Sequence, residues 1–239
     1  MLKVKLVTIG RFWHFHLARQ LLKYNLLDEI YSGYPKFKLV DEKNIPLEKI
    51  KTYPYYQVPY LFYNRYFQNA LPFINHYLSD LSHKKMAIKV SKNIGNSNVL
   101  IGTSGSSLEA GKKIKSLHGK FICDRGSSHI NFQNETLKNE YKNFNLIYNE
   151  ISQKTLDREL EEYDTADLIS VPSSFVYNSF LKNGIEEKKL FLNPFGVNLD
   201  RFSPIPKIKN SKFQVLYVGT LSIRKGIFYL LEAFKKLNF

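Results

Sequence analysis

Short apolar runs of strand length alternate with helical patterns along almost the whole chain. Leu2–Ile9 is apolar apart from two lysines, and residues 13–24 then show apolar side chains at helical spacing. Further strand-length runs lie at 29–31, 98–101, 120–123, 166–171 and around 190. Strands that alternate with helices form parallel sheets, because each connection returns through a helix. The alternation therefore predicts an α/β fold of Rossmann-like, doubly wound parallel sheets, and 239 residues suffice for one large or two modest domains.

The chain is strongly basic, with a formal net charge of +14. Most of the excess is lysine in pairs such as Lys84-Lys85 and Lys112-Lys113, which is typical of solvated helix faces. Two other interpretations stay open, namely attraction to anionic lipid head groups and sequence-blind attraction to nucleic acid. The sequence has neither zinc-finger spacing nor an RNA-recognition signature, so we expect no specific nucleic-acid partner.

Three features bear on where the protein works. The single cysteine, Cys123, excludes an internal disulfide, suits a reducing compartment and ends a strand, where a buried thiol is expected. Lys3, Lys5 and Arg11 interrupt the first apolar run, which is unlike the core of a signal peptide. No run approaches the ~18 apolar residues of a membrane span. We expect a cytoplasmic protein, with peripheral contact at the inner membrane face as an option.

The segment Leu61–Leu81 is rich in Phe and Tyr and follows a stretch, 35–59, that its prolines mark as a loop. It predicts one or two helices around Pro72. Two interpretations are open. The segment is either a crossover helix buried against the sheet or, with Arg65 and the lysine pair that follows, a surface that docks on a membrane.

The last stretch, Phe213–Phe239, predicts a strand at 214–218, a tight loop at Gly219 and a helix with apolar residues at helical spacing from Ile227. Ser222 stands where an N-cap is expected. Arg224 and Lys225 would then lie in the first helical turn, where each cation opposes the helix dipole at a cost of about 0.3–1 kcal/mol. A bound anion would remove this conflict. The stretch is either a diphosphate site or ordinary packing of a strand and a helix.

Polar loops follow three of the predicted strands. The first, GRFWHFHLARQL, has a single glycine and lacks the dinucleotide fingerprint, and its His14 and His16 are either acceptor contacts or surface residues at a helix start. Gly102–Ser107 consists of small residues, which either admit a ligand or simply form a turn. Ligands bind at the carboxyl edge of such sheets, so these loops are the candidate site.

The third loop, DRGSSH, is the strongest candidate. Asp124, Arg125 and His129 bring a carboxylate, a guanidinium and an imidazole within six residues. The alternative is that Asp124 and Arg125 pair with each other and His129 caps the next helix. A nearby acidic group, Glu159, Glu161 and Glu162, is expected to face solvent and not to act as a catalytic pair.

Two segments carry a family resemblance: ADLISVPSSFVYNSFLKNGIEEKKLFLNPFGVNLDRFSP at 166–204 and GTLSIRKGIFYLLEAF at 219–234. In order and spacing they resemble the retaining glycosyltransferases of family 4, which have the GT-B fold. The resemblance is close over about the last 75 residues and looser before them. It implies transfer of a sugar, with retention, from a nucleotide-diphosphate donor to a glycan or lipid-linked acceptor, in cell-surface polysaccharide synthesis. No metal or other cofactor is expected.

The resemblance also implies a domain organisation. Residues 1–205 would form an acceptor-binding Rossmann-like domain, and 206–239 would be the first strand, loop and helix of an incomplete donor-binding domain. Two glutamates that contact the donor in the family would lie beyond this point, so we expect the 239-residue chain to have little or no transferase activity. The alternative is a noncatalytic module that binds an acceptor or a membrane surface.

The expected site residues fall into three groups. Catalysis is assigned to Asp124, Arg125 and His129. Donor binding is assigned to Gly10, Gly219, Thr220, Arg224 and Lys225. Acceptor binding is assigned to Arg11, Phe12, His14, Ser104, Gly105, Gly126 and Ser127. The family often has arginine where this chain has Thr220, so the phosphate contact is expected from Arg224 and Lys225. Family members commonly have a histidine near the strand end that Asp124 occupies here, and His129 comes five positions later.

Overall fold

The computed structural model describes residues 2–67, 70–197, 199, 202 and 214–237. The chain divides into two compact units. Unit 1 comprises residues 1–133 and 151–194, and unit 2 comprises residues 134–150 and 195–239. The predicted domain boundary between 205 and 206 lies outside the described residues.

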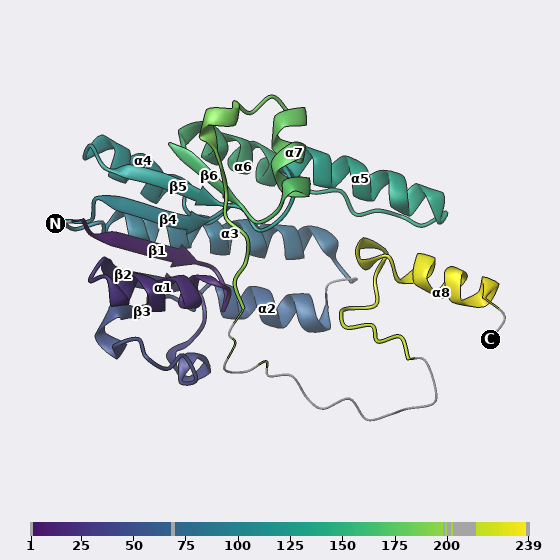
Figure 1. Cartoon of the computed structure of the whole chain (residues 1–239), viewed down its shortest axis with the longest axis horizontal. Coiled ribbons are helices and arrows are strands. Elements are labelled where there is room, and N and C mark those ends of the chain that lie inside the picture. The colour runs from purple at the N-terminus through teal and green to yellow at the C-terminus, as the bar shows by residue number, and fades with distance from the viewer. Residues whose placement is uncertain (1, 68–69, 198, 200–201, 203–213, 238–239) are drawn as a thin grey trace. The chain divides into compact units, whose positions relative to one another are not determined.

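Unit 1 is built on one parallel sheet of seven strands, in the order β3-β2-β1-β4-β5-β6-β7 (Figure 1). The strands are β1 (Val4–Thr8), β2 (Leu27–Ser32), β3 (Ile50–Thr52), β4 (Val99–Thr103), β5 (Lys120–Asp124), β6 (Leu168–Val171) and β7 (Leu190–Leu192). Every neighbouring pair is parallel. The predicted α/β fold with a doubly wound, Rossmann-like parallel sheet is confirmed, because the order runs outward in both directions from the β1 and β4 pair.

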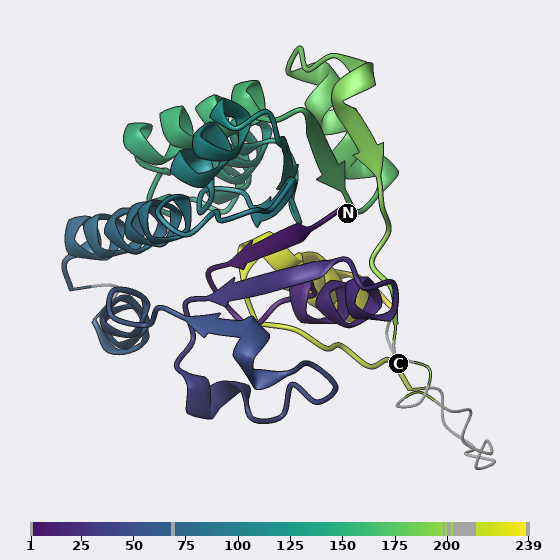
Figure 2. The ribbon, with the colours of Figure 1, turned by 90° about the vertical axis from the view of Figure 1, so that its left-hand side faces the viewer.

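Helices cover both faces of the sheet, as Figure 2 shows with α1 on one side and α3 and α4 on the other. The α-helices of the described residues are α1 (His14–Lys23), α2 (Gln57–Tyr66), α3 (Pro72–Ser91), α4 (Leu108–Ser116), α5 (Ile130–Asn143), α6 (Gln153–Thr165), α7 (Ser174–Lys182) and α8 (Ile227–Lys236). Among these residues no helix combines the length and apolar character needed to cross a bilayer.

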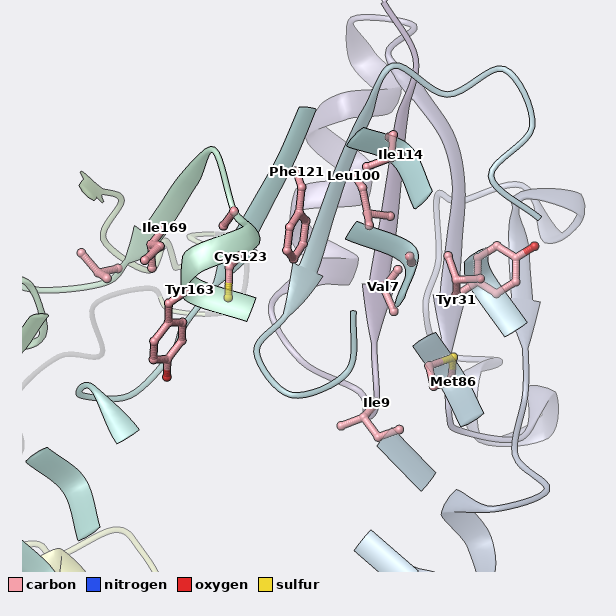
Figure 3. Close-up of a cluster of buried hydrophobic side chains, with 14 of the residues drawn as sticks. Val7, Ile9, Tyr31, Met86, Leu100, Ile114, Phe121, Cys123, Tyr163 and Ile169 are labelled. Atoms are coloured by element: carbon pink, nitrogen blue, oxygen red, sulfur yellow. The ribbon is translucent and has the colours of Figure 1, made fainter. Parts of the chain in front are cut away.

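Each face of the sheet has its own core, because side chains alternate along a strand. Val4 and Leu6 of β1 pack with Phe15 of α1 on one face. Val7 and Ile9 belong to the larger core on the opposite face, and Figure 3 shows part of it. That core also includes Met86, Leu100, Ile114, Phe121, Cys123, Tyr163 and Ile169. The expected burial of the Cys123 thiol is confirmed.

Local signals in the sequence set several element ends correctly. The Ser173 side chain accepts a hydrogen bond from the backbone N–H of Val176 and caps α7, and Gly184 follows that helix with φ of +82°. Pro72 stands at the start of α3, so the segment around it forms two helices. The stretch 35–59 is not all loop, since it holds the edge strand β3 and the first residues of α2.

Unit 2 differs from the prediction. No strand forms at 214–218, where Leu216 and Val218 are each 85% exposed. A strand is stable only when a neighbour pairs with it, and no described strand lies beside this segment. The unit consists instead of the later part of α5 and of α8, whose Phe228 ring packs on Phe144 and whose Tyr229 hydroxyl donates to Glu140.

We expect Gly111→Ala to destabilise the protein. Gly111 lies in α4 against β5, and a Cβ atom there would stand 2.5 Å from the Phe121 ring. Alanine favours helix by roughly 1 kcal/mol over glycine, but overpacking a core typically costs about 1–3 kcal/mol. Urea unfolding should therefore show a net loss, whereas Ser116→Ala at an exposed position of the same helix should change the free energy of unfolding by less than about 0.5 kcal/mol. A more stable Gly111→Ala protein would show that this contact yields easily.

Candidate functional site

The candidate site lies at the carboxyl edge of the sheet in unit 1. The loops after β1 and β4 meet this edge on either side of the point where the strand order reverses, and the loop after β5 is next to them. In open α/β sheets ligands bind at such a reversal. The structure thus brings the predicted catalytic residues and the predicted acceptor residues to one edge.

Asp124 at the end of β5 faces the loop after β1. Its Oδ2 accepts a hydrogen bond of 2.6 Å from the indole N–H of Trp13 and lies 3.1 Å from Nε2 of His14. The Trp13 ring stacks on the His14 ring with 5.2 Å between centroids. A Cβ atom on Gly126 would stand 2.3 Å from the Trp13 ring, so only glycine allows this approach. Sequence reasoning missed Trp13, although it stands between two predicted residues.

His14 is fully buried, which corrects the view of it as a surface residue at a helix start. In the described part of the chain neither ring nitrogen makes a hydrogen bond of good geometry, despite the short distance to Asp124. A buried polar atom without a partner costs about 1–3 kcal/mol, so such atoms call for an explanation. His16, two residues later, is the exposed one and contacts Arg19.

Arg125 points to a different partner. Its guanidinium lies 2.6 Å from Oε2 of Glu159 on α6 and donates to the carbonyl of Ser128. The same Glu159 oxygen accepts hydrogen bonds from the hydroxyls of Ser104 and Tyr163. The alternative in which Arg125 pairs with its neighbour Asp124 is therefore wrong.

The small-residue loop after β4 is clamped by α6. Glu162 accepts hydrogen bonds from the backbone N–H groups of Gly105 and Ser107, and the Arg158 guanidinium donates to the Gly105 carbonyl at 2.7 Å. Ser104 and Gly105, both predicted acceptor contacts, are thus buried parts of this network. Their side-chain and backbone groups are already engaged by protein.

The expectation that the acidic group faces solvent is wrong for Glu159 and Glu162, which are buried, and holds only for Glu161, which is exposed beside Lys112. A signal for this existed in the sequence. Glu159 is four residues from Tyr163, on the helix face that carries the apolar residues of α6. Burial raises the pKa of Glu162 to about 7, even though two backbone N–H groups favour its charged form.

His129 has a third environment. Its ring packs against the rings of Tyr163 and Phe180, with centroids 5.2 and 5.1 Å away. Burial and the nearby charge of Arg125 lower its pKa to about 4, so the imidazole is neutral at pH 7. Its Nδ1 is buried and without a hydrogen bond in the described residues. The three predicted catalytic side chains therefore point to separate neighbours and form no triad.

The other residues predicted to bind ligands at this edge already make some contacts within the protein. Arg11 donates to Glu42, and the exposed Phe12 ring lies over Gly10, where a Cβ atom would stand 2.9 Å away. The Gly10 carbonyl accepts a hydrogen bond from Ser32. Ser127 donates to Gln133 at the start of α5.

The predicted donor residues belong to unit 2. Gly219 and Thr220 are exposed, and the Tyr217 hydroxyl donates to the Thr220 carbonyl. Arg224 and Lys225 lie in a separate 3₁₀ turn (Ile223–Lys225), which corrects their placement in the first turn of the helix. Gly226, with φ of +68°, ends that turn and precedes α8, because this left-handed conformation cannot continue either helix.

Ser222 precedes the 3₁₀ turn and makes no side-chain cap. The two cations therefore stand before the N-terminus of α8, and the predicted conflict with its dipole is weaker than expected. Among the described residues, no group of three or more His, Cys, Asp or Glu side chains could hold a metal ion.

Comparisons with known proteins find a fold likeness only. No family model and no curated protein matches the chain. The UDP-GlcNAc 2-epimerase from Methanocaldococcus jannaschii is 13% identical, with a TM-score of 0.45 over 80% of this chain and 45% of that one. TcCGT1 in complex with UDP is 14% identical, with a TM-score of 0.49 over 87% of this chain and 53% of its own.

Anabaena Alr3699/HepE, in complex with UDP and glucose, is 10% identical, with a TM-score of 0.48 over 86% of this chain and 47% of its own. This chain thus spans about half of the length of these structures. At such identities and TM-scores the likeness carries no functional argument, and the fold assignment rests on the strand order.

The buried Glu162 should make a contribution to stability that falls as pH rises. Its pKa is about 7 in the folded protein and near 4.5 when exposed, so the folded state favours the proton and loses stability between pH 4.5 and 7. At about 1.36 kcal/mol per pKa unit, the loss is on the order of 3 kcal/mol.

Urea unfolding from pH 4.5 to 8 should show this loss as a difference between two proteins: the free energy of unfolding of the unchanged protein minus that of Glu162→Gln should fall as pH rises. The difference is needed because the lowered pKa values of His83 and His129 add an opposite slope to both proteins. Glu161→Gln, at the exposed neighbour, should keep the original slope. An unchanged slope in Glu162→Gln would mean that Glu162 titrates normally.

Proposed function

We propose that the chain belongs to a cytoplasmic glycosyltransferase of the GT-B type, in which unit 1 binds the acceptor and unit 2 contributes to binding of a nucleotide-diphosphate sugar. The sequence resemblance supports transfer with retention to a glycan or lipid-linked acceptor in surface polysaccharide synthesis. The Rossmann-like strand order supports the fold that this activity needs.

The observation that carries the proposal is the buried His14 beside Asp124 at the reversal point of the sheet. Within the described residues neither imidazole nitrogen makes a hydrogen bond of good geometry, although Nε2 lies 3.1 Å from Oδ2 of Asp124, so the ring is able to gain a hydrogen bond from a ligand. Asp124 would orient the ring, and a sugar hydroxyl would supply the missing partner once the Trp13 ring moves aside, because His14 has no exposed surface. Trp13 is partly exposed, so it would offer apolar ring surface to a sugar.

In unit 2 the diphosphate would bind at the 3₁₀ turn and the N-terminus of α8. Both cations of the turn are exposed, and α8 is ten residues long with free backbone N–H groups in its first turn. Positive charge there would stabilise the leaving diphosphate as the glycosidic bond breaks, without a metal. Gly226 would let the backbone bend around the phosphate oxygens.

We expect Arg224→Gln and Lys225→Gln together to weaken binding of UDP or GDP, whichever binds, by roughly tenfold to a hundredfold, since a charge-assisted hydrogen bond is worth about 1.5–3 kcal/mol. Isothermal titration with each nucleotide measures this. Lys235→Gln with Lys236→Gln removes the same charge at the far end of α8 and should leave the affinity within about twofold. An equal loss in both double variants would mean diffuse attraction and not a site.

Binding at the sheet edge can be followed through Trp13, the only tryptophan. We expect at least one member of a panel of sugars and nucleotide sugars to change its fluorescence with saturation. His14→Ala should weaken that ligand about tenfold, the worth of one buried hydrogen bond of about 1.4 kcal/mol. His16→Ala is the matched control and should leave the affinity unchanged, because His16 points outward. No response from any sugar, or equal losses in both variants, would contradict the role of His14.

A further inference from the structure

The end of the α2 and α3 hairpin exposes apolar side chains that the sheet-edge site does not use. The end of α2 and the start of α3 meet there, since the Tyr63 hydroxyl donates to the Leu71 carbonyl (Figure 1). Five large side chains lie exposed around this meeting point, and we call them the aromatic tip. They are Phe62 (59% exposed), Tyr66 (61%), Phe67 (48%), Leu71 (46%) and Phe73 (67%).

Three of these side chains, Phe62, Tyr66 and Phe67, form a connected group at the end of α2. Phe62 and Tyr66 are four residues apart on one helix face, and their ring centroids are 5.1 Å apart. The Phe67 ring is 6.2 Å from that of Phe62. Val58, one turn before Phe62, continues the same face and is 44% exposed. Contiguous apolar surface of this kind marks a contact site more often than a scattered exposed residue does.

The polarity of α2 is unusual for a surface helix, because its buried residue is the polar Gln57, while Phe62 and Tyr66 are exposed. The side toward α3 is held by polar bonds, from Ser82 to the buried Gln57 at 2.7 Å and between Asn75 and Asn64 at 3.0 Å. The rings lie on the outer side. Because burial of a Phe side chain is worth about 1.5–3 kcal/mol, water alone would favour the opposite arrangement. This arrangement is favourable if a less polar surface than water covers the exposed rings.

The charges near the aromatic tip indicate what kind of surface binds it. Between Glu48 and Asp80 the sequence has no acidic residue, and of its basic residues Arg65 lies on α2, whereas Lys49 and Lys51 contact residues of β2. The Arg65 guanidinium lies 5.5 Å from the Tyr66 ring centroid, so a cation stands directly at the aromatic tip. Exposed rings beside a cation, in a segment whose sequence has no acidic residue, match the interface of an anionic bilayer.

We propose that the aromatic tip docks on the surface of a bilayer that contains anionic lipid. The rings would enter the head-group region, and Arg65 would pair with lipid phosphates. This contact needs no sugar and no donor, so it stands or falls separately from the proposed function. The tip belongs to the helix that follows the carboxyl end of β3, so docking would hold the substrate edge of the sheet near the membrane surface.

The test is flotation of the full chain with vesicles of phosphatidylcholine containing phosphatidylglycerol. We expect binding to these vesicles, and at least about a tenfold fall in the partition coefficient for the combined variant Phe62→Ser, Tyr66→Ser, Phe73→Ser, because ring insertion contributes more than 1.4 kcal/mol in total. Arg65→Gln should weaken binding to the anionic vesicles and leave the weak binding to pure phosphatidylcholine unchanged.

The matched control is Tyr24→Ser with Phe37→Ser, which removes exposed rings elsewhere on unit 1 (72% and 69% exposed) and should bind like the unchanged protein. Circular dichroism and thermal unfolding confirm that each variant is folded. Equal binding of the triple variant, or binding that depends only on salt and not on the rings, would overturn the proposal and leave diffuse lysine attraction. A triple variant that changes the oligomeric state but not vesicle binding would overturn it in favour of a second copy of the chain.

Discussion

Two buried carboxylates on α6 hold the carboxyl edge of the sheet in one arrangement. Glu159 accepts bonds from Ser104 and Tyr163 and neutralises Arg125, and Glu162 fixes the backbone of the loop after β4. Buried charges are tolerated only where such partners surround them. Removal of Glu159 would leave Arg125 buried without its carboxylate, so this side chain ties the loops after β4 and β5 together. The rest of the edge is built on this fixed side.

On the other side of the edge, around the loop after β1, one buried side chain lacks a hydrogen bond in the described residues. Asp124 and Trp13 satisfy each other at 2.6 Å, but His14 is enclosed without a hydrogen bond of its own in the described residues. On the side of Glu159 the buried carboxylates are partnered, although Nδ1 of His129 on that side also makes no hydrogen bond in the described residues. Because an unsatisfied buried nitrogen destabilises the protein, its retention next to a rigid carboxylate favours a ligand-binding role over a packing role.

The sheet was predictable from sequence because strand and helix signals are local. The apolar runs located β1, β2, β4, β5, β6 and β7, and Ser173 and Gly184 marked the ends of α7. The hydrogen-bond network at the carboxyl edge was not predictable, because Arg125 pairs with Glu159, which is 34 residues away in the sequence. No local sequence pattern reveals such a contact. The strand expected at 214–218 failed for the same reason, because pairing depends on a neighbour and not on the segment itself. Gly226 also split an expected helix, as its left-handed conformation is invisible in an apolar pattern.

Two helices in unit 1 turn polar groups inward, and they do so for different reasons. On α6 the inward carboxylates meet backbone N–H groups and a guanidinium, so each buried polar atom gains a strong partner and the helix is anchored to the loops it clamps. On α2 the inward amides meet only a serine and another amide, neutral bonds that contribute little net stability. The inward carboxylates of α6 are explained by the loop backbone and the guanidinium that they bind. The inward amides of α2 have no comparable partners, and the notable feature of this helix is its exposed rings. The exposed rings of α2 are therefore the feature that calls for a partner, and the absence of acidic residues from 49 to 79 limits which surfaces attract them.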